Sequence, residues 1–393
     1  VPDPKGHNII VVIYQILLSI TALFFGSLTG VLVKRVPENK NFGLARSECT
    51  HCSYQLKWYE NIPIISFIIL LGKCSNCKGK ISYFYPLIEL GFLVCAIPFI
   101  NIAVKRFVAF NGFFDQAFIL LDFLFYMGFI ALALALGLID QKKMILPHKL
   151  TYSGIILGIV YVSLFASPYY SYSESLASLM SWMPGFFLSS FSAVKQFAIV
   201  VFTLDLFVYF TNLLVFRENA LLESSNALTF GQKKLQESTK LVYLLYLLLL
   251  LSLIYFGFSI ALEIFFIVVG FLYLWFEIIP YLFSQEQIDE NTVDHGAKKT
   301  ILGGGDIMML GFFATVLGFI KSSLVLVTSF YIAFIFLMFK IIYEYFKFQL
   351  DNRKANLEEQ DNNFDIKTMF RGNIPLGLAL AISFITVMMM LAK

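Results

Sequence analysis

The sequence predicts an all-α polytopic membrane protein with about ten transmembrane helices and a small cytoplasmic zinc-ribbon-like segment. Of the 393 residues, 59% are hydrophobic and only 14% are charged, whereas a soluble domain carries about 25% charged residues. Several apolar stretches exceed the roughly 18 residues that a membrane-spanning helix needs. Four of the five cysteines form two CxxC pairs within a polar stretch. These observations exclude an ordinary soluble protein.

The charge balance narrows the expected partners. Lys and Arg total 29 against 26 Asp and Glu, a net charge of +3, which is no surplus of the kind that nucleic-acid binding requires. With 17% aromatic residues, the expected surroundings are a lipid bilayer. The first apolar run is too long for a cleaved secretory signal and lacks its small-residue cleavage pattern, so we expect a retained span.

Apolar runs bounded by polar clusters place the expected spans. They lie near 9–33, 86–104, 116–139, 151–167, 196–216, 241–259, 261–283, 307–320, 323–346 and 373–392. Lys and Arg crowd the segment 34–85, which the positive-inside rule places in the cytoplasm. Alternating spans then place the loops near 140–150, 217–240, 284–306 and 347–372 on that side as well, with Lys105, Arg106 and Lys321 as the main exceptions.

The cysteine pairs predict a metal site. Cys49 and Cys52, then Cys74 and Cys77, form a CxxC…CxxC pattern with 21 residues between the inner two, close to the zinc-ribbon template. Two such turns facing one another supply four thiolates to a tetrahedral Zn²⁺. A segment this small can hardly bury a core, so the metal would help to fold it. Two disulfides are disfavoured in a reducing cytoplasm, and a redox pair does not explain two matched pairs.

Two carboxylates lie at the expected cytoplasmic ends of spans. Asp140 follows a long apolar run, and Asp306 opens another directly after Gly303, Gly304 and Gly305. If the two carboxylates meet in space, one holds a proton while the other accepts a proton from water. Aspartic proteases divide the acid and base roles between two aspartates in this way. The three glycines lack Cβ atoms and would let an extended substrate backbone approach closely.

Other interpretations of these carboxylates compete. A phosphate-binding glycine loop is disfavoured, because no strand precedes the glycines and no Lys-Ser/Thr follows them. Asp306 is well placed for a helix N-terminal cap, which remains open as an alternative. Asp140 ends a helix, where a carboxylate opposes the helix dipole, so its presence needs another explanation. Further acidic residues in or near apolar runs are Glu89, Asp122, Asp205, Glu263 and Glu277. We expect the last three to be packing or interfacial residues.

Taken together, several motifs resemble the bacterial type IV prepilin peptidases, which are membrane aspartyl proteases of the GxGD kind. The motifs are Gly26-Ser27, the block 58–63 (WYENIP), the block 85–89 (YPLIE), Asp140 with Leu146-Pro147, the block 303–306 (GGGD) and the block 374–377 (IPLG). The resemblance covers roughly 23–160 and 300–390. It implies that Asp140 and Asp306 are the catalytic pair.

The resemblance also implies a substrate and a second activity. Family members remove the basic leader of prepilins or pseudopilins at the cytoplasmic face of the bacterial inner membrane. They usually then methylate the new N-terminus from S-adenosylmethionine. No glycine-rich fingerprint identifies a methyl-donor site in this chain, so we assign methylation to the segment 34–85. Glu89, at the exit of this segment into the membrane, is a secondary candidate for pairing with the substrate's α-amino group.

The expected organisation follows from the spans and from the resemblance. It consists of a first span (1–33), the cytoplasmic tetra-cysteine segment (34–85), helices with the first aspartate (86–167), an expanded region (168–300) and the GxGD-bearing helices (301–393). The family usually has about eight spans, so 168–300 carries the extra helices. Two other functions compete with this one. A cation-coupled transporter predicts internal repeats, which are not seen, and an inactive pilus-assembly scaffold does not explain why both aspartates are present.

Overall fold

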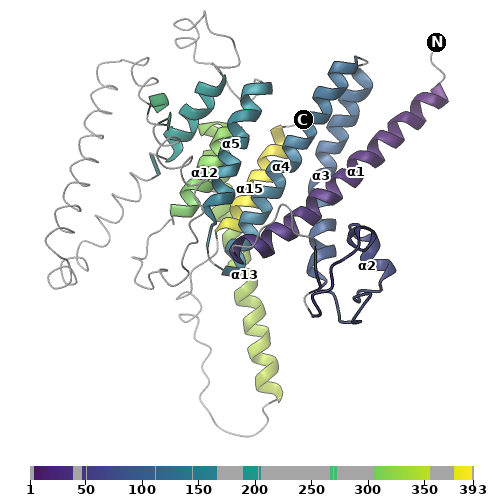
Figure 1. Cartoon of the computed structure of the whole chain (residues 1–393). Helices are drawn as coiled ribbons and strands as arrows, with labels where there is room; N and C mark the ends of the chain where they lie inside the picture. Colours follow the sequence, from purple (N-terminus) through teal and green to yellow (C-terminus); the bar gives the residue numbers. More distant parts are fainter. Residues whose placement is uncertain are drawn as a thin grey trace, which may run out of the picture. The chain divides into compact units, whose positions relative to one another are not determined.

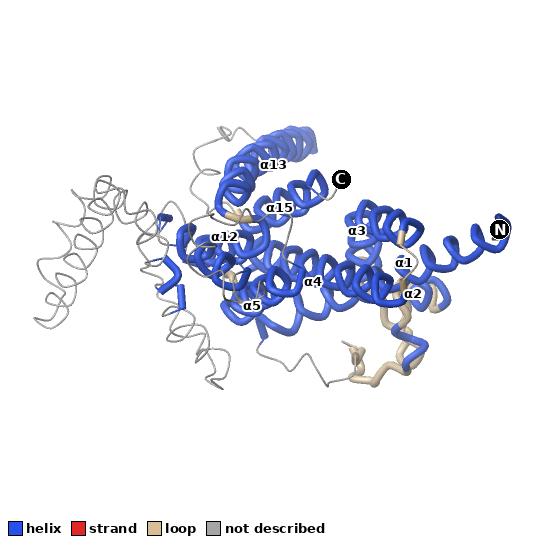
Figure 2. Tube along the Cα trace, turned by 90° about the horizontal axis from the view of Figure 1, so that it is seen from above, coloured by secondary structure: helices blue, strands red, loops and turns tan. Residues whose placement is uncertain are grey.

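The protein is helical in the part of the chain that the structure describes. A computed structural model describes residues 4–38, 47–49, 51–110, 112–143, 145–165, 189–201, 203–204, 266–268, 270–271, 304–354 and 376–391. Among these residues there are helices and loops, with two isolated β-bridges and no named strand. Figure 2 shows this all-helical character from above. The predicted fold class is therefore confirmed.

The named helices follow the apolar runs closely. They are α1 (Pro4–Arg35), α2 (Ile65–Ile69), α3 (Phe84–Ala109), α4 (Phe113–Lys143), α5 (His148–Phe165), α12 (Gly304–Leu317), α13 (Phe319–Lys354) and α15 (Gly377–Leu391), with short 3₁₀ turns η1 (Val36–Glu38) and η2 (Trp58–Asn61). At 36 residues, α13 runs further than the expected span 323–346. The expected span 241–259 lies outside the described residues, and 261–283 is described only at 266–268 and 270–271.

Five of the described helices are long and apolar enough to cross a membrane. They are Ile9–Glu38, Phe84–Ala109, Phe114–Lys143, His148–Phe165 and Ile320–Lys340. Three shorter apolar helices accompany them: Ser189–Val201, Gly305–Leu317 and Gly377–Met390. The five longer helices have 18 to 30 residues, which is enough at 1.5 Å per residue to cross a hydrocarbon core of roughly 30 Å. These helices support a multi-pass membrane protein, while the count of about ten spans stays a prediction.

The chain divides into two compact units. One comprises Val1–Pro147 with Ser323–Lys393, and the other comprises His148–Ser322. Within the first unit, α4 packs against α1, α3 and α15 (Figure 1). Its central residues, among them Met127 and Ile130, are fully buried. The core of this unit is therefore built around α4, the helix that carries Asp140.

Glycine allows two of these helices to approach closely. A Cβ atom added to Gly26 of α1 would lie 2.9 Å from the Cα atom of Glu89 and 3.1 Å from the Cβ atom of Phe92, both in α3. Real Cβ contacts are longer, so α1 and α3 can pack this tightly only with glycine at this position. Small residues at such crossings are a general device of membrane helices, because packing rather than hydrophobic burial holds the helices together.

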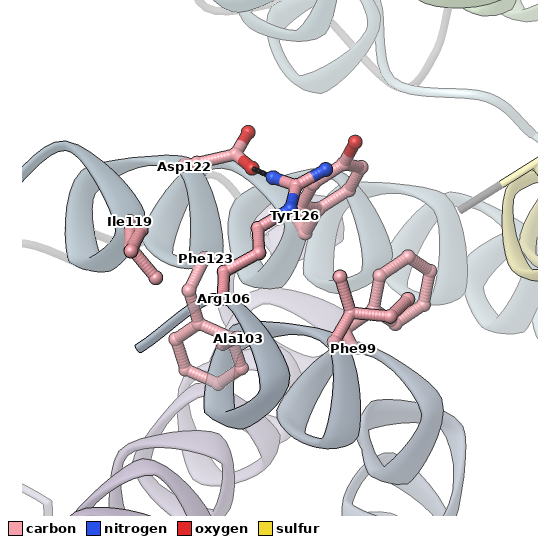
Figure 3. A pocket seen from close by; sticks show the side chains of 8 residues that line it. Phe99, Ala103, Arg106, Ile119, Asp122, Phe123 and Tyr126 are labelled. Atoms are coloured by element: carbon pink, nitrogen blue, oxygen red, sulfur yellow. Dashed lines mark hydrogen bonds and ion pairs between the residues drawn. The ribbon is translucent and has the colours of Figure 1, made fainter. Parts of the chain in front are cut away.

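An ion pair joins α3 to α4 inside the apolar region. The Arg106 Nη1 atom lies 2.7 Å from the Asp122 Oδ2 atom, and the two side chains are 44% and 11% exposed. Figure 3 shows Arg106 reaching toward Asp122, with the aromatic rings of Phe99, Phe123 and Tyr126 nearby. A charged residue in a membrane span commonly pairs with another. Arg106, an exception to the charge rule used for topology, thus has its charge balanced by Asp122.

Candidate functional site

Asp140 lies in the last turn of α4 and is 8% exposed. Its Oδ2 atom accepts a hydrogen bond of 2.8 Å from the backbone N–H of Gly377, the first residue of α15. The carboxylate therefore faces the N-terminal end of α15, where unpaired N–H groups and the helix dipole favour negative charge. This contact answers the electrostatic difficulty noted in the sequence, because α15 compensates for the unfavourable dipole of α4.

Two glycines make this contact possible. A Cβ atom on Gly377 would lie 2.8 Å from the Cβ atom of Asp140 and 2.9 Å from its Oδ2 atom. A Cβ atom on Gly137, one turn earlier in α4, would lie 2.8 Å from the Cα atom of Leu378 and 3.0 Å from the carbonyl oxygen of Gly377. Gly377 belongs to a motif that the sequence pointed to, but the role of Gly137 was missed. The sequence feature that could have indicated this role is the position of Gly137, three residues before Asp140.

Asp306 is half-buried in the first turn of α12. Gly304 and Gly305 precede it within that turn, and Gly303 lies outside the described residues. The carboxylate occupies a position where it stabilises a helix N-terminus, so the cap and the catalytic interpretations both remain. Asp306 belongs to the unit His148–Ser322 and Asp140 to the other unit. Their meeting in one active site stays a prediction.

Close packing fixes α12 within its own unit. Gly154 of α5 lies against the ring of Phe312, which an added Cβ atom would approach to 2.9 Å, and Gly158 contacts Thr315. On another face of α12, a Cβ atom on Gly311 would lie 2.8 Å from the ring of Phe197, in the helix Ser189–Val201. These backbone approaches hold α12, and with it Asp306, against two neighbouring helices.

The two cysteine pairs sit on matching turns. An isolated β-bridge pairs Glu48 with Gln55, and another pairs Lys73 with Lys80. The backbone N–H of the first cysteine in each turn donates a hydrogen bond of 2.9 Å, from Cys49 to the Tyr54 oxygen and from Cys74 to the Gly79 oxygen. The second turn thus repeats the first at a constant offset along the chain. Each turn presents two thiols on one side.

The four thiols form one cluster. The Sγ atoms of Cys49, Cys52, Cys74 and Cys77 all lie within 4.8 Å of one another. The Cys49 and Cys77 sulfurs are 3.8 Å apart, which equals the edge of about 3.8 Å of a tetrahedron with Zn–S bonds of about 2.3 Å. All four cysteines are free, because a disulfide needs about 2.05 Å between its sulfurs. The donor set can bind zinc, and the disulfide alternative is not what the structure forms.

The electrostatics of the cluster also suit a cation. Backbone N–H groups of His51 and Cys52 hold the pKa of Cys49 below its usual value. The Gly79 N–H lowers the pKa of Cys77, but Cys52, burial and the other thiols raise it to about 11. Four adjacent thiolates repel one another, and a bound cation would relieve this repulsion. The His51 Nε2 atom lies 3.3 Å from the Lys80 oxygen, and His51 is not part of the four-cysteine cluster.

Glu89 connects the tetra-cysteine segment to α3. Its Oε2 atom accepts a hydrogen bond of 2.7 Å from the backbone N–H of Ile64, and the residue is only 8% exposed. Ile64 has a φ of +59°, an unusual conformation for a β-branched residue that needs support from its surroundings. The carboxylate provides such support. Its pairing with a substrate amino group stays a prediction.

The chain is similar in sequence to proteins of a known family. Residues 20–105, which include the C-terminal part of α1, the tetra-cysteine segment and most of α3, match the family model of the bacterial peptidase A24 N-terminal domain. The chain resembles the type IV prepilin peptidases. The resemblance inferred from the sequence motifs is therefore confirmed. No solved structure matches the chain.

Curated relatives carry the same name, prepilin leader peptidase/N-methyltransferase. The Vibrio cholerae protein is 34% identical over 158 residues, which is 38% of this chain and 57% of the relative. The Pseudomonas aeruginosa protein is 31% identical over 188 residues, 41% of this chain and 59% of the relative. The Stutzerimonas stutzeri protein is 39% identical over 130 residues, 32% of this chain and 40% of the relative. The chain spans about half the length of the prepilin peptidases it matches.

Proposed function

We propose that the protein is a membrane aspartyl endopeptidase that removes the basic leader of type IV prepilins or pseudopilins and then methylates the new N-terminus. The reaction takes place at the cytoplasmic face of the bacterial inner membrane. The observation that carries the proposal is the match of residues 20–105 to a peptidase A24 domain, together with a buried Asp140 held at the junction of α4 and α15. The names of the relatives support both activities.

Cleavage uses the carboxylates of Asp140 and Asp306. A water molecule between them loses its proton to the ionised aspartate and attacks the carbonyl carbon after the leader, while the protonated aspartate donates a hydrogen bond to the carbonyl oxygen. The two carboxylates titrate as one unit. The fixed contact with Gly377 supports this role for Asp140, because it holds the carboxylate in one orientation. Glycines before Asp306 leave room for an extended peptide.

The tetra-cysteine segment is proposed to hold a structural Zn²⁺ through Cys49, Cys52, Cys74 and Cys77. The cluster of four thiols and the 3.8 Å separation of two of them support this ligand set. Zinc held by four cysteines is a closed site without an open position for substrate. Its part is to fold the segment, which is too small to depend on a hydrophobic core.

Methylation is assigned to the segment 34–85, with Glu89 as the group that pairs with the new α-amino group. S-adenosylmethionine supplies an electrophilic methyl group when it is bound. The support is the peptidase A24 domain match, which contains the whole segment, and the name of the relatives. The buried carboxylate of Glu89 lies where this segment meets α3. This position suits a contact with the positively charged α-amino group of a substrate whose N-terminus begins a membrane helix.

One assay tests both activities. The detergent-solubilised protein is incubated with a prepilin and a labelled methyl donor, and mass spectrometry of the product reports the cleavage site and the methylated N-terminus. Asp140→Asn and Asp306→Asn should each lower the rate of cleavage at least about 10³-fold, because each removes one carboxylate of a pair that acts together. Asp122→Asn is the matched control, since it changes another buried carboxylate of α4 that pairs with Arg106.

Cleavage by the two aspartate variants decides whether the aspartyl-protease assignment is right. If both aspartate variants insert correctly and cleave a prepilin at near-normal rates, the aspartyl-protease assignment is wrong and the carboxylates serve as helix caps. Asparagine nearly preserves the shape of aspartate, so a fold defect should not mask the outcome. Serine- and thiol-directed reagents should leave cleavage intact as long as the tetra-cysteine segment is undisturbed, because no acyl-enzyme forms.

A further inference from the structure

Between the two cysteine turns, α2 presents an exposed apolar face. Ile65, Ile68 and Ile69 are spaced so that they share one side of the helix, and Ile69 is 72% exposed. The opposite side holds Phe67, whose ring packs 5.5 Å from the ring of Tyr83. The helix is therefore anchored to its segment by one face and leaves a continuous aliphatic face without cover from the described residues.

Two further exposed apolar residues lie close to α2: Leu71 follows it by two residues, and Trp58 belongs to η2, which contacts α2. Both are 82% exposed, and the ring of Trp58 lies 5.7 Å from that of Tyr59. Soluble surfaces seldom expose so many large apolar side chains together. We call the set Trp58, Tyr59, Ile65, Ile68, Ile69 and Leu71 the α2 apolar face.

The tether to Glu89 gives the depth of α2. Phe84 is the first residue of α3 and of the corresponding candidate span, and Glu89 lies about 7 Å further along the helix axis. Side chains of a helix lean toward its N-terminus, so the carboxylate that binds Ile64 at 2.7 Å lies level with the first turn of the span. Because α2 begins at Ile65, it starts at that level too.

A second contact also places Glu89 inside the apolar part of the helices. The backbone of Glu89 lies against Gly26 of α1, where an added Cβ atom would be 2.9 Å from the Glu89 Cα atom. Gly26 precedes the basic last turn of α1, which contains Lys34 and Arg35, by about 13 Å along the axis. Glu89 is therefore well inside the apolar length of two membrane helices. Ile64 binds the end of the Glu89 side chain, which leans toward the start of α3.

The charges around the α2 apolar face suit an anionic surface. In the described residues 47–49 and 51–83, the exposed basic residues are Lys57, Lys73, Lys78 and Lys80. Glu48 is exposed, whereas Glu60 is buried and accepts a hydrogen bond of 2.8 Å from the Lys57 backbone N–H. Tryptophan and tyrosine are typical of the membrane interface, and lysines near it attract anionic headgroups.

We propose that the α2 apolar face inserts into the lipid leaflet that holds the start of α3, so that the tetra-cysteine segment lies on the membrane rather than free in the cytoplasm. The occupant of the face is a phospholipid bilayer with anionic headgroups. Interfacial helices bury their apolar side about 5–10 Å into the boundary between headgroups and acyl chains, which agrees with the depth that the Glu89 tether gives. This inference does not depend on the proposed catalytic activity.

Photolabelling tests the proposal directly. The full chain is reconstituted in nanodiscs of phosphatidylglycerol and phosphatidylcholine, with a small share of phosphatidylcholine that carries a diazirine in its acyl chain. After illumination, peptide mass spectrometry should find lipid adducts on 65–71. The exposed side of α1, with Ile13 and Leu17, is the positive control in the same sample. The turn around Gln55, which is exposed and does not belong to the α2 apolar face, is the negative control.

The outcomes separate the possible occupants of the face. Lipid adducts on 65–71 in the absence of any substrate, lost in an Ile68→Glu/Ile69→Glu variant but kept in Gln55→Glu, support the proposal. Adducts on α1 with none on 65–71 overturn it. A photo-crosslinker placed at Ile69 that yields a chain-to-chain product instead of lipid adducts also overturns it, because a second copy then covers the face.

Discussion

Gly137→Ala tests whether Asp140 depends on the close approach of α4 and α15. The new Cβ atom would lie 2.8 Å from the Cα atom of Leu378 and 3.0 Å from the Gly377 carbonyl oxygen. Carbon atoms normally rest about 3.5–4.0 Å apart, so the helices must separate by several tenths of an ångström. Overpacking of this kind costs about 1–3 kcal/mol. Alanine recovers about 0.8–1.0 kcal/mol of helix propensity, and the balance is a destabilisation of roughly 1 kcal/mol.

Gly91→Ala is the matched control. Gly91 lies inside α3, and an added Cβ atom there meets no heavy atom within 4 Å. This variant should keep the gain in helix propensity of about 0.8–1.0 kcal/mol. The two glycine variants should therefore differ by about 1–3 kcal/mol, the overpacking cost alone. Denaturant titration of the purified proteins in mixed micelles measures the difference in their free energies of unfolding.

The same variants report on the active site. Separation of α4 from α15 displaces the Asp140 carboxylate and stretches its 2.8 Å hydrogen bond to Gly377. A displacement approaching 1 Å costs about 10²-fold in rate, so Gly137→Ala should cleave a prepilin far more slowly than Gly91→Ala. If both variants unfold at the same denaturant concentration and cleave at the wild-type rate, then the glycine contact has no part in holding Asp140 and the reasoning is wrong.

Three further predictions concern the remaining contacts. Replacing Cys49 and Cys77 by serine should remove about one equivalent of zinc per chain, measured by plasma mass spectrometry, and full occupancy would exclude this ligand set. Arg106→Ala should unfold at lower denaturant than the double variant with Asp122→Ala, because the largely buried Asp122 carboxylate then loses the positive charge of Arg106; equal midpoints would argue against the ion pair. Glu89→Gln retains an oxygen acceptor, so the segment should stay folded and cleave while methylation falls, and unaltered methylation would eliminate its amino-group role.

The helical fold and the cysteine cluster could be predicted from sequence because both depend on local properties. An apolar run long enough to span the bilayer must become a helix, since lipid offers no partners for backbone N–H and C=O groups. Helices α1, α3, α4 and α5 accordingly contain or overlap the apolar runs that predicted them. The CxxC spacing likewise brings two thiols together within one turn. Asp140 was also identified locally, from its place at the end of an apolar run.

The partners of the buried polar groups came only from the tertiary structure. Asp140 binds the N–H of a residue 237 positions away in sequence. Glu89 supports the backbone of Ile64, and Arg106 pairs with Asp122 across two helices. No local pattern encodes these contacts, because they depend on which helices pack together and how closely. Glycine at the crossings sets that closeness, and a buried carboxylate is tolerated only where a neighbouring element supplies a donor or a positive charge.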